Sequence, residues 1–523
     1  MIEVETETKE SRIYRMRWWT LFAVSLSVLI VVLDSTVMNV ALPTIQAKLN
    51  ATSTELEWMV NAYTLVLGAL MLTSGLLGDR LGRAKLLQAG VALFGLSSLA
   101  AIFAGTATIL IICRIFMGLG AALIMPNSLA IVTNIFPAEE RGRAIGVWVG
   151  ISSVGVALGP VIGGSLVQNF NWNSIFIINI PVVFVALVAG WFLIPNSRDD
   201  NPRKLDIPGN ILAIGALAIL LFGLINGGSW GWTNTGVLGS LCGSVILIAL
   251  FILWERRVAQ PMLEIGFFRN SRFSASIGAV CIMGLALNGV MYILTYYMQF
   301  VKGYTPLETG VRFIPLASGL FLGAGTVDRV VKRLDTKRVV LAGFIAAAIV
   351  LSFMSRFSIE SPFWQLGIGL FFLGFFLGYI VAPAMDALMG ALPEAQAGIG
   401  SGMANASRMV AGAVGVAALG SALSSIYSAH FDKAAATIPG LPIDLAKKAS
   451  DSVGRAIGIA HSGKLPADTA NALTQAAKHS FMDGWQTATV ISAVIFVAGA
   501  LTVLKFMPGR TKYTTLVEDP HLD

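Results

Sequence analysis

An acidic residue interrupts a long apolar run near the N-terminus. Residues 31–43 read VVLDSTVMNVALP, and Asp34 lies inside an apolar segment that extends from Trp18 to Pro43. A segment of about 25 apolar residues is long enough to span a bilayer as a helix. A carboxylate at the centre of such a helix costs ~2.5–3.5 kcal/mol on insertion scales. We therefore treat Asp34 as a candidate functional residue.

A basic residue, Arg114, lies inside another apolar segment, residues 108–132. Asp34 precedes the end of its segment by about eight residues and Arg114 follows the start of its segment by about seven, so a rise of ~1.5 Å per residue gives them a similar depth. Burial disfavours the charged form of a carboxyl group, whereas a neighbouring arginine favours it. The two residues predict a carboxyl group that exchanges a proton for a cation; a static ion pair is the alternative.

Other polar and aromatic residues in the apolar segments are weaker candidates. Asp386 and Arg408 lie in consecutive predicted spans and could pair, with Asp386 as a second proton-coupling acid. Aromatic faces hold lipophilic cations. Substrate contacts are therefore predicted for four tyrosines and two asparagines: Tyr63, Asn127, Tyr292, Tyr296, Tyr379 and Asn405. Packing is the alternative role for each of them.

The composition defines the class of protein that must position these residues. The 523 residues are 55% hydrophobic and 12% charged, whereas a soluble domain carries about 25% charged residues. Repeated apolar runs of about 20 residues predict an all-α polytopic membrane protein. The cysteines suggest neither a disulfide framework nor a metal site, and residues 458–465 (GIAHSGKL) match a phosphate loop only in part. We predict no cofactor, no metal and no nucleic acid partner.

Fourteen apolar segments are predicted to span the bilayer. They are residues 17–41, 57–78, 84–104, 108–132, 143–166, 172–194, 207–226, 236–255, 273–300, 308–329, 338–356, 363–390, 397–426 and 482–506. Lys and Arg cluster in every second loop, as at Arg80, Arg83 and Lys85. The positive-inside rule makes these loops cytoplasmic, and an even number of spans places both termini there. We expect a multi-pass protein of the cell (inner) membrane.

A charged, glycine-rich motif follows the second span. In residues 75–86 (GLLGDRLGRAKL), the key residues fit the pattern Gly-x3-Asp-Arg-x-Gly-Arg; they are Gly75, Asp79, Arg80, Gly82 and Arg83. The glycines allow a tight turn and Asp79 can pair with arginines, so we expect these residues to act in a conformational switch. In a weaker copy at 323–338 (GAGTVDRVVKRLDTKR), Asp328 and Arg329 are predicted to correspond to Asp79 and Arg80.

The motif at 75–86 resembles the signature loop of the major facilitator superfamily, and its repetition implies two related halves. The implied fold is two six-helix pseudo-repeats plus two extra helices. The chain then divides into an N-terminal half (17–194), two extra spans with their loops (195–270) and a C-terminal half (271–506), between cytoplasmic tails at 1–16 and 507–523. The loop 427–481 is polar and lies outside. Two of its segments open on proline and an acidic residue, which predicts an α-hairpin.

Residues 146–164 (GVWVGISSVGVALGPVIGG) carry a second pattern. Gly155, Gly159 and Gly163 are four apart, a spacing that lets a neighbouring helix approach closely. Pro160 should kink the helix. This segment resembles the antiporter signature of drug exporters, and these four residues are also expected to take part in the conformational switch.

Two further segments resemble the same branch. Residues 33–43 resemble its first-span signature, and 114–126 resemble the motif in which a buried arginine serves proton transfer. Together with fourteen spans, they make the chain similar to the fourteen-span drug:proton antiporters, the branch of quaternary-ammonium multidrug efflux pumps. In contrast to some dication exporters of that branch, residues 400–415 (GSGMANASRMVAGAVG) contain no acid.

The resemblance implies a proton-coupled multidrug efflux antiporter that exports lipophilic, mostly cationic compounds. Asp34, Arg114 and Asp386 would couple transport to protons, and Asp34 would also contact the substrate. The implied partners are a small molecule, a proton and the lipid bilayer, and the protein would be a monomer. Export of a lipid or an endogenous metabolite by the same alternating-access mechanism is the alternative. A membrane-embedded enzyme is a distant alternative, because the four histidines lie in the long outer loop or the tail.

Overall fold

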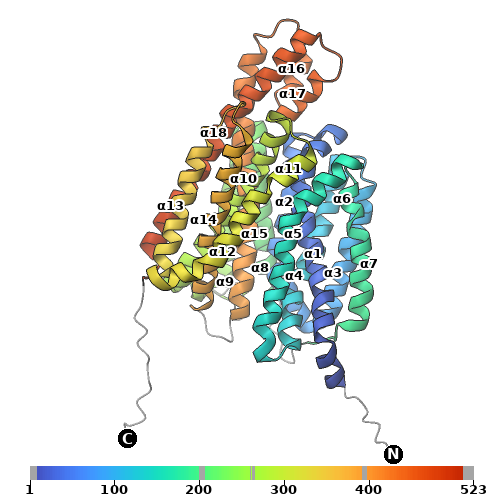
Figure 1. Cartoon of the computed structure of the whole chain (residues 1–523), viewed down its shortest axis with the longest axis vertical. Helices are drawn as coiled ribbons and strands as arrows, with labels where there is room; N and C mark the ends of the chain where they lie inside the picture. The colour runs from blue at the N-terminus through green and yellow to red at the C-terminus, as the bar shows by residue number, and fades with distance from the viewer. Residues whose placement is uncertain (1–8, 199–205, 259–260, 262–264, 392–396, 510–523) are drawn as a thin grey trace, which may run out of the picture.

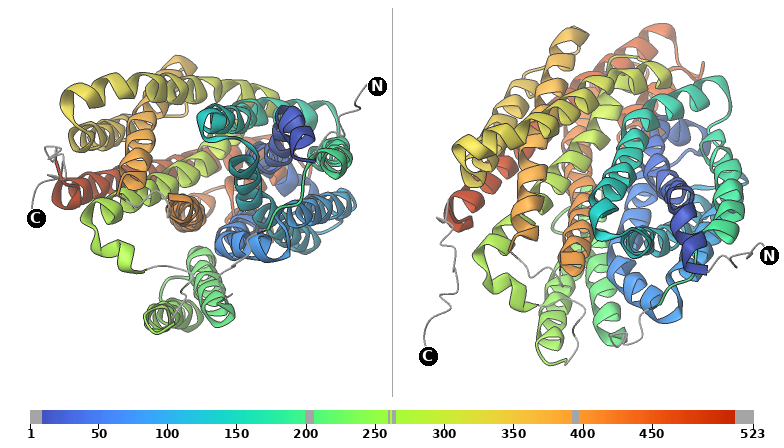
Figure 2. Two further views of the ribbon diagram at one scale, coloured as in Figure 1. Left: turned by 90° about the horizontal axis from the view of Figure 1, so that it is seen from below. Right: turned by 60° about the horizontal axis from the view of Figure 1, so that its bottom comes forward.

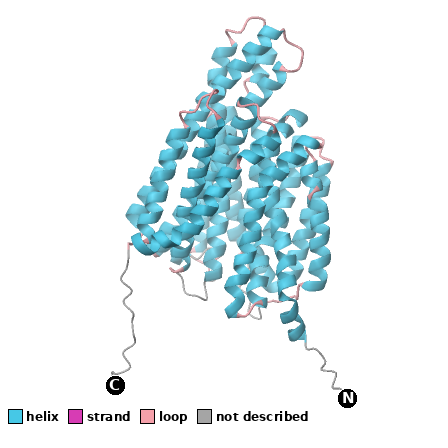
Figure 3. Ribbon diagram, in the orientation of Figure 1, coloured by secondary structure: helices cyan, strands magenta, loops and turns pink. Residues whose placement is uncertain are grey.

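The computed structural model describes residues 9–198, 206–258, 261, 265–391 and 397–509, and in this part of the chain all regular structure is helical (Figures 1 and 3). Thirteen of the described helices are long and apolar enough to cross a membrane. The helix α5 (Ala138–Asn169) is also long, although only Val154–Asn169 counts as an apolar segment. The predicted all-α polytopic fold is confirmed, and the count of fourteen spans stays a prediction.

The helices fall into three consecutive groups. The first group contains α1 (Lys9–Leu49), α2 (Ser53–Leu81), α3 (Arg83–Ile102), α4 (Ala107–Ile135), α5, α6 (Ser174–Ile177) and α7 (Asn179–Leu193). The second contains α8 (Ile207–Trp230) and α9 (Thr235–Glu255). The third contains η1 (Ile265–Arg269), α10 (Ser271–Tyr296), η2 (Tyr297–Val301), α11 (Pro306–Arg312), α12 (Ile314–Leu334), α13 (Thr336–Met354), α14 (Phe363–Met389), α15 (Ala397–Ala435), α16 (Ile443–Ala449), α17 (Val453–Ala460) and α18 (Ala467–Phe506).

Several helices begin at side chains that satisfy their free N–H groups. Thr52 and Glu55 form a capping box at the start of α2. The Asp206 side chain accepts a hydrogen bond from the Gly209 N–H at the start of α8. Such caps stabilise a helix by about 1 kcal/mol each. They define where the chain leaves one apolar helix and turns into the next.

The bundle has two distinct ends (Figure 1). We call the end at which α1 begins and α18 ends the terminal end, and the opposite end, which carries α16 and α17, the hairpin end. Because α1 begins and α18 ends on the same side, the chain crosses the bundle an even number of times. This arrangement supports α5 as a crossing in addition to the thirteen helices above.

The first and third groups pack mainly within themselves. In the first, α1 lies against α5 and α7, and α4 lies against α2 and α3. In the third, α10 packs on α15 and α18, and α12 packs on α14. The groups meet where α2 contacts α15 and where α5 contacts α11. The pair α8 and α9 lies at one edge of the bundle, with α8 against α2 and α15 (Figure 2).

The helices around the predicted outer loop differ from the expectation. Both α15 and α18 extend beyond their apolar segments, to Ala435 and from Ala467. The first predicted short helix is divided into α16 and α17 near Asp451, and the second predicted short helix is the start of α18. The polar sequence between 467 and 481 contains no proline or glycine, so the helix continues from the apolar segment without a break.

Candidate functional site

Asp34 and Arg114 form an ion pair inside the first helix group. The Nη1 atom of Arg114, on α4, donates to the Oδ2 atom of Asp34, on α1. The side chain of Asp34 is only 3% exposed and that of Arg114 only 1%. The predicted pairing at a common depth is therefore confirmed. A buried pair of this kind is destabilised by ~3–5 kcal/mol when one partner is removed, because the other charge is left uncompensated.

Arg114 has further partners on α2. Its Nε atom donates to the Met59 carbonyl oxygen at 3.0 Å. Its guanidinium group lies 4.1 Å from the centre of the Tyr63 ring. The Tyr63 hydroxyl donates to the Val31 carbonyl oxygen at 3.1 Å. Tyr63 was predicted to contact substrate; in this conformation it is buried and supports the arginine.

A residue that the sequence analysis missed completes the environment of Asp34. Asn179, at the start of α7, donates from Nδ2 to Asp34 Oδ1 at 3.3 Å and to Ser98 Oγ at 3.0 Å. Asp34 therefore has a partner on each oxygen. The signal was available, since Asn179 is a polar residue within an apolar segment, but asparagine in a span also serves helix packing.

The second predicted acid–base pair does not form. Asp386 is exposed near the end of α14, and Arg408 donates from Nη2 to Asn405 Oδ1 at 3.4 Å. Within the described residues no ion pair joins Asp386 to Arg408. The prediction of Asp386 as a buried acid is wrong, because the side chain points out of the helix packing at the terminal end.

The predicted aromatic and amide contacts lie in different places. Tyr292 and Tyr296 are buried near the hairpin end of α10, with ring centres 5.1 Å apart. The Tyr379 hydroxyl lies 3.4 Å from Thr326 Oγ1, between α14 and α12. Asn127 donates to the Ser74 and Leu123 carbonyl oxygens, between α4 and α2. These side chains therefore lie between different pairs of helices in this conformation, and their role in substrate binding stays a prediction.

The turn between α2 and α3 is held by a charged pair. Arg83 donates from Nε to Asp79 Oδ1 at 2.8 Å, and its N–H donates to the Ser197 carbonyl oxygen at 2.9 Å. Gly82 has φ +108°, a left-handed conformation that favours glycine. A Cβ atom on Gly78 would lie 1.7 Å from Asn127 Oδ1, so α2 and α4 are in close contact beside the turn.

The repeated turn between α12 and α13 corrects the predicted correspondence. Asp335 has φ +90° and separates the two helices, as Gly82 separates α2 and α3. Asp79 lies three residues before Gly82, and the residue three before Asp335 is Lys332. Asp328 and Arg329 lie about one helical turn further into α12, so Asp328 does not correspond to Asp79. The second copy therefore carries a basic residue where the first carries its acid.

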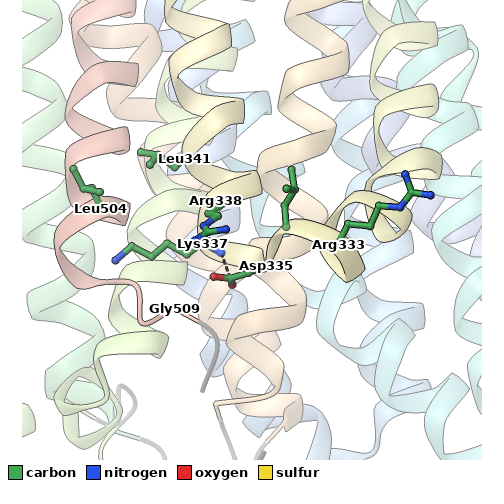
Figure 4. A pocket seen from close by; sticks show the side chains of 8 residues that line it. Arg333, Asp335, Lys337, Arg338, Leu341, Leu504 and Gly509 are labelled. Atoms are coloured by element: carbon green, nitrogen blue, oxygen red, sulfur yellow. Dashed lines mark hydrogen bonds between the residues drawn. The ribbon is translucent and has the colours of Figure 1, made fainter. Parts of the chain in front are cut away.

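A hollow of about 600 Å³ adjoins this second turn (Figure 4). Arg333, Lys337 and Arg338 line it, with Leu504 at the end of α18. The Asp335 side chain accepts a hydrogen bond from the Lys337 N–H at 3.1 Å. The hollow lies at the terminal end of the bundle and is separate from the Asp34–Arg114 pair.

The glycine face of α5 packs against α1, as its spacing predicted. A Cβ atom on Gly155 would lie 3.0 Å from the Leu29 side chain. A Cβ atom on Gly159 would lie 1.9 Å from Thr36 Oγ1, and one on Gly163 would lie 2.8 Å from the Val37 side chain. Pro160 lies within the same continuous helix, whose bending remains a prediction. This contact holds α5 directly beside the helix that carries Asp34.

Two packed groups of membrane-length helices, one of which encloses an acid–arginine pair, are an arrangement typical of membrane transporters built from two repeats. The sequence profile of the Major Facilitator Superfamily matches residues 24–416. The chain belongs to this superfamily.

Relatives of known identity cover nearly the whole chain. The tetracenomycin C resistance and export protein of Streptomyces glaucescens is 33% identical over 491 residues, 93% of this chain and 91% of that protein. The multidrug efflux pump LfrA of Mycolicibacterium smegmatis is 30% identical over 503 residues, 96% and 98% of the two chains.

The fold also matches solved structures. An inward-facing bacterial homologue of the human lysosomal transporter Spinster shares the fold, with a TM-score of 0.62 at 16% identity over 93% and 96% of the chains. The chain is thus a multi-pass cell membrane protein that groups with the drug efflux transporters of the superfamily.

Proposed function

We propose that the protein is a proton-coupled antiporter that exports lipophilic, mostly cationic compounds. The observation that carries this proposal is the buried Asp34–Arg114 pair, whose carboxyl group has a partner on each oxygen. A proton and a cationic substrate would each replace Arg114 at Asp34, so that they bind the Asp34 carboxyl group alternately. Two relatives are named as a resistance and export protein and as a multidrug efflux pump, and they support drugs as the substrate class.

Arg114 can give up its carboxylate partner because it keeps two others. The Met59 carbonyl oxygen and the face of the Tyr63 ring stay beside the guanidinium group when Asp34 is neutral. A cation over an aromatic face is stabilised by ~2 kcal/mol or more where water is excluded. The cost of separating the ion pair is therefore reduced, which favours exchange over a static structural role.

The charges of α15 favour substrates with a single positive charge. Between Gly402 and Ser428 this helix contains Arg408 and no acidic residue. A second cationic group of a substrate would meet a guanidinium group there instead of a carboxylate. We therefore propose monovalent lipophilic cations rather than dications as the preferred substrates.

The proposed orientation places the hairpin end outside the cell. Basic residues gather at the terminal end, as at Arg83, Arg141 and Arg338, and the positive-inside rule assigns that end to the cytoplasm. Substrate would then enter from the terminal end and leave at the hairpin end. We further propose that the protein works as a monomer.

Asp34→Asn tests the proposal, because it removes the titratable group with little change in volume. We expect efflux of ethidium from loaded cells to fall to the level of cells without the protein, since an amide cannot take up and release a proton. Asp386→Asn is the matched control: the same change at an exposed acid should leave efflux intact. Normal efflux by a well-expressed Asp34→Asn protein would falsify the assignment of Asp34.

A further inference from the structure

Another buried acid, Glu57, lies near the hairpin end of α2. Glu57 is 2% exposed, and among the described residues its Oε2 atom has no hydrogen-bond partner. An ionised carboxyl group in such a place carries a penalty of several kcal/mol unless a charge compensates it. The group is therefore stable there when a proton or a cation neutralises it.

Glu57 faces a small cavity between the first and third helix groups. A Cβ atom on Gly420 of α15 would lie 2.6 Å from Glu57 Oε1 and 3.2 Å from the Tyr292 ring of α10. The cavity is also lined by residues of the segment that joins α16 to α17. The carboxyl group thus lies where α2, α10, α15 and that segment meet.

No basic side chain lines this cavity in the described part of the chain. Its titratable groups, besides Glu57, are Tyr292 and Tyr296 from α10, Tyr427 from α15 and Asp451 from the segment between α16 and α17. Among the described residues, the Tyr296 hydroxyl also has no hydrogen-bond partner.

Asp451 is the second carboxyl group at the cavity. Its Oδ2 atom accepts a hydrogen bond from the Ser53 N–H at 3.2 Å, and Arg455 lies 3.7 Å from the same oxygen. Burial raises the pKa of the Asp451 carboxyl group, against the opposing effect of Arg455. Two carboxyl groups that share a site resist simultaneous ionisation. Both groups therefore favour uptake of a cation at this point.

The size of the cavity limits which cations can enter it. Its volume is about 30 Å³, and one water molecule needs ~10–15 Å³ on the same measure. Pockets for drug-sized molecules have volumes of about 300–1,000 Å³. The cavity can therefore admit about two water molecules but not an organic cation. A proton delivered by water fits, and among the described residues no group of three or more His, Cys, Asp or Glu side chains is placed to hold a metal ion instead.

The segment between α16 and α17 borders the cavity and is bonded to the first helix group in this conformation. The Gln46 Nε2 atom donates to Ser452 Oγ at 2.7 Å, and Ser53 Oγ donates to the Asp451 carbonyl oxygen at 3.0 Å. Arg455 donates to the Asn50 carbonyl oxygen at 2.7 Å. These bonds join the third helix group to the first. Separation of the groups at the hairpin end would break them and expose Glu57 to water.

We propose that Glu57 is a second proton-binding site, which takes up a proton from the hairpin side when that end closes and returns it to the same side when that end opens. The carboxylate accepts the proton from water on closure and gives it back to water on opening, and no other bond changes. The inference rests on the proposed alternating-access function. Acid on the hairpin side stabilises the closed state, since that state binds the additional proton.

Cysteine labelling from the hairpin side measures this equilibrium. Ser424 lines the cavity and Ser462 is exposed between α17 and α18. Each is replaced singly by cysteine, Ser424→Cys or Ser462→Cys, in a chain whose three native cysteines are replaced. A membrane-impermeant maleimide labels both proteins in cells. We divide the labelling rate of Ser424→Cys by that of Ser462→Cys, so that the pH dependence of the thiol itself cancels. Between external pH 5.5 and 8.5 we expect the ratio to rise about fivefold or more as Glu57 ionises.

Glu57→Gln should keep the ratio low at every pH, because the amide is neutral and remains compatible with the closed cavity. Glu57→Asp, which keeps a titratable group, should restore the rise. Asp451→Asn should move the rise to lower pH, because Glu57 then loses a competing negative charge. An unchanged rise in Glu57→Gln, or loss of the rise in Asp451→Asn alone, would overturn the proposal. The proposed function is tested separately. If Asp34→Asn loses ethidium efflux, the proposed function is still supported even when one of these two results overturns the role of Glu57.

Discussion

Asp34 is embedded in a network that extends well beyond its ion pair. Asn179 holds one carboxylate oxygen, Arg114 holds the other, and Tyr63 with the Met59 carbonyl oxygen holds Arg114. Four helices, α1, α2, α4 and α7, therefore meet at one charged group. A change in protonation at Asp34 alters contacts on each of these helices, so a single proton can bias their packing.

Asp79 should control the rate of transport and not substrate affinity. It lies at the terminal end of α2, far along the helix from Tyr63, and bonds to Arg83 at the start of α3. The pair is half-buried and joins the ends of two helices. A single ion pair near the surface contributes up to about 1 kcal/mol to stability, so Asp79→Asn should fold. We expect turnover in proteoliposomes to drop severalfold while equilibrium binding of tetraphenylphosphonium stays within about twofold of the parent value.

Glu308→Gln is the control for Asp79→Asn, because Glu308 forms the same type of pair with Arg312, at 3.7 Å, but at the hairpin end. Its turnover should match that of the parent protein. A large loss of equilibrium binding in Asp79→Asn at unchanged turnover would contradict the assigned role.

Sequence alone located the Asp34–Arg114 pair because both residues are charged and lie at the same depth of apolar segments. It missed Glu57 because an acid in the first turns of a predicted span is also typical of a helix start. It treated Asp386 as a buried acid because sequence does not show which side of a helix faces the core. Burial of single side chains depends on contacts between distant segments, such as α2 with α15.

At the scale of the helices, the α1–α5 contact is a close approach beside Asp34. The helix axes can come together because Gly155, Gly159 and Gly163 present no side chain to Leu29, Thr36 and Val37. Other glycines of α5 are in open surroundings: a Cβ atom on Gly146 or Gly150 would meet no described atom within 4 Å. The same helix therefore contains both constrained and unconstrained glycines.

Gly159→Ala should impair both stability and transport. The added methyl group would lie 1.9 Å from Thr36 Oγ1, so the Thr36 side chain or α5 itself must shift. Overpacking of this kind costs ~1–3 kcal/mol. We expect a lower unfolding temperature in detergent and reduced ethidium efflux. Gly150→Ala, on the same helix, should behave like the parent protein; equal effects of the two changes would show that the α1 contact is not the cause.

The helices were predictable to the extent that apolar length determines them. Runs of about 20 apolar residues identified the spans, but α15 and α18 continue as helices into polar sequence up to Ala435 and from Ala467. The motif copy at 323–338 was aligned by its Asp-Arg pair, whereas the turn is fixed by the positive φ of Asp335. A backbone conformation carried by a residue other than glycine leaves little trace in sequence.

At the scale of the whole molecule, the two acids to which we assign protons, Asp34 and Glu57, occupy different positions. Asp34 lies within the first helix group, whereas Glu57 lies where this group meets the third group and the segment between α16 and α17. Closure at the hairpin end covers Glu57 directly, and it reaches Asp34 only through the packing of α1 and α2. We therefore assign coupling to Asp34 and the proton dependence of closure to Glu57.

This division predicts the stoichiometry of transport. A proton that binds Glu57 from the hairpin side and leaves to the same side carries no charge across the membrane. If Asp34 alone carries a proton inward, exchange for one monovalent cation is electrically neutral. A pH difference of one unit then supplies ~1.4 kcal/mol. A potential of 100 mV would supply ~2.3 kcal/mol per net charge moved, but it supplies nothing to an electrically neutral exchange.

In proteoliposomes, tetraphenylphosphonium antiport should follow an imposed pH gradient. Valinomycin potentials should be applied with the pH gradient held constant and passive leak subtracted using Asp34→Asn vesicles. A rate component that depends on potential and persists after this subtraction would show that a second proton is carried. Its loss in Glu57→Gln would then identify Glu57 as a carrier and not as a site that returns its proton.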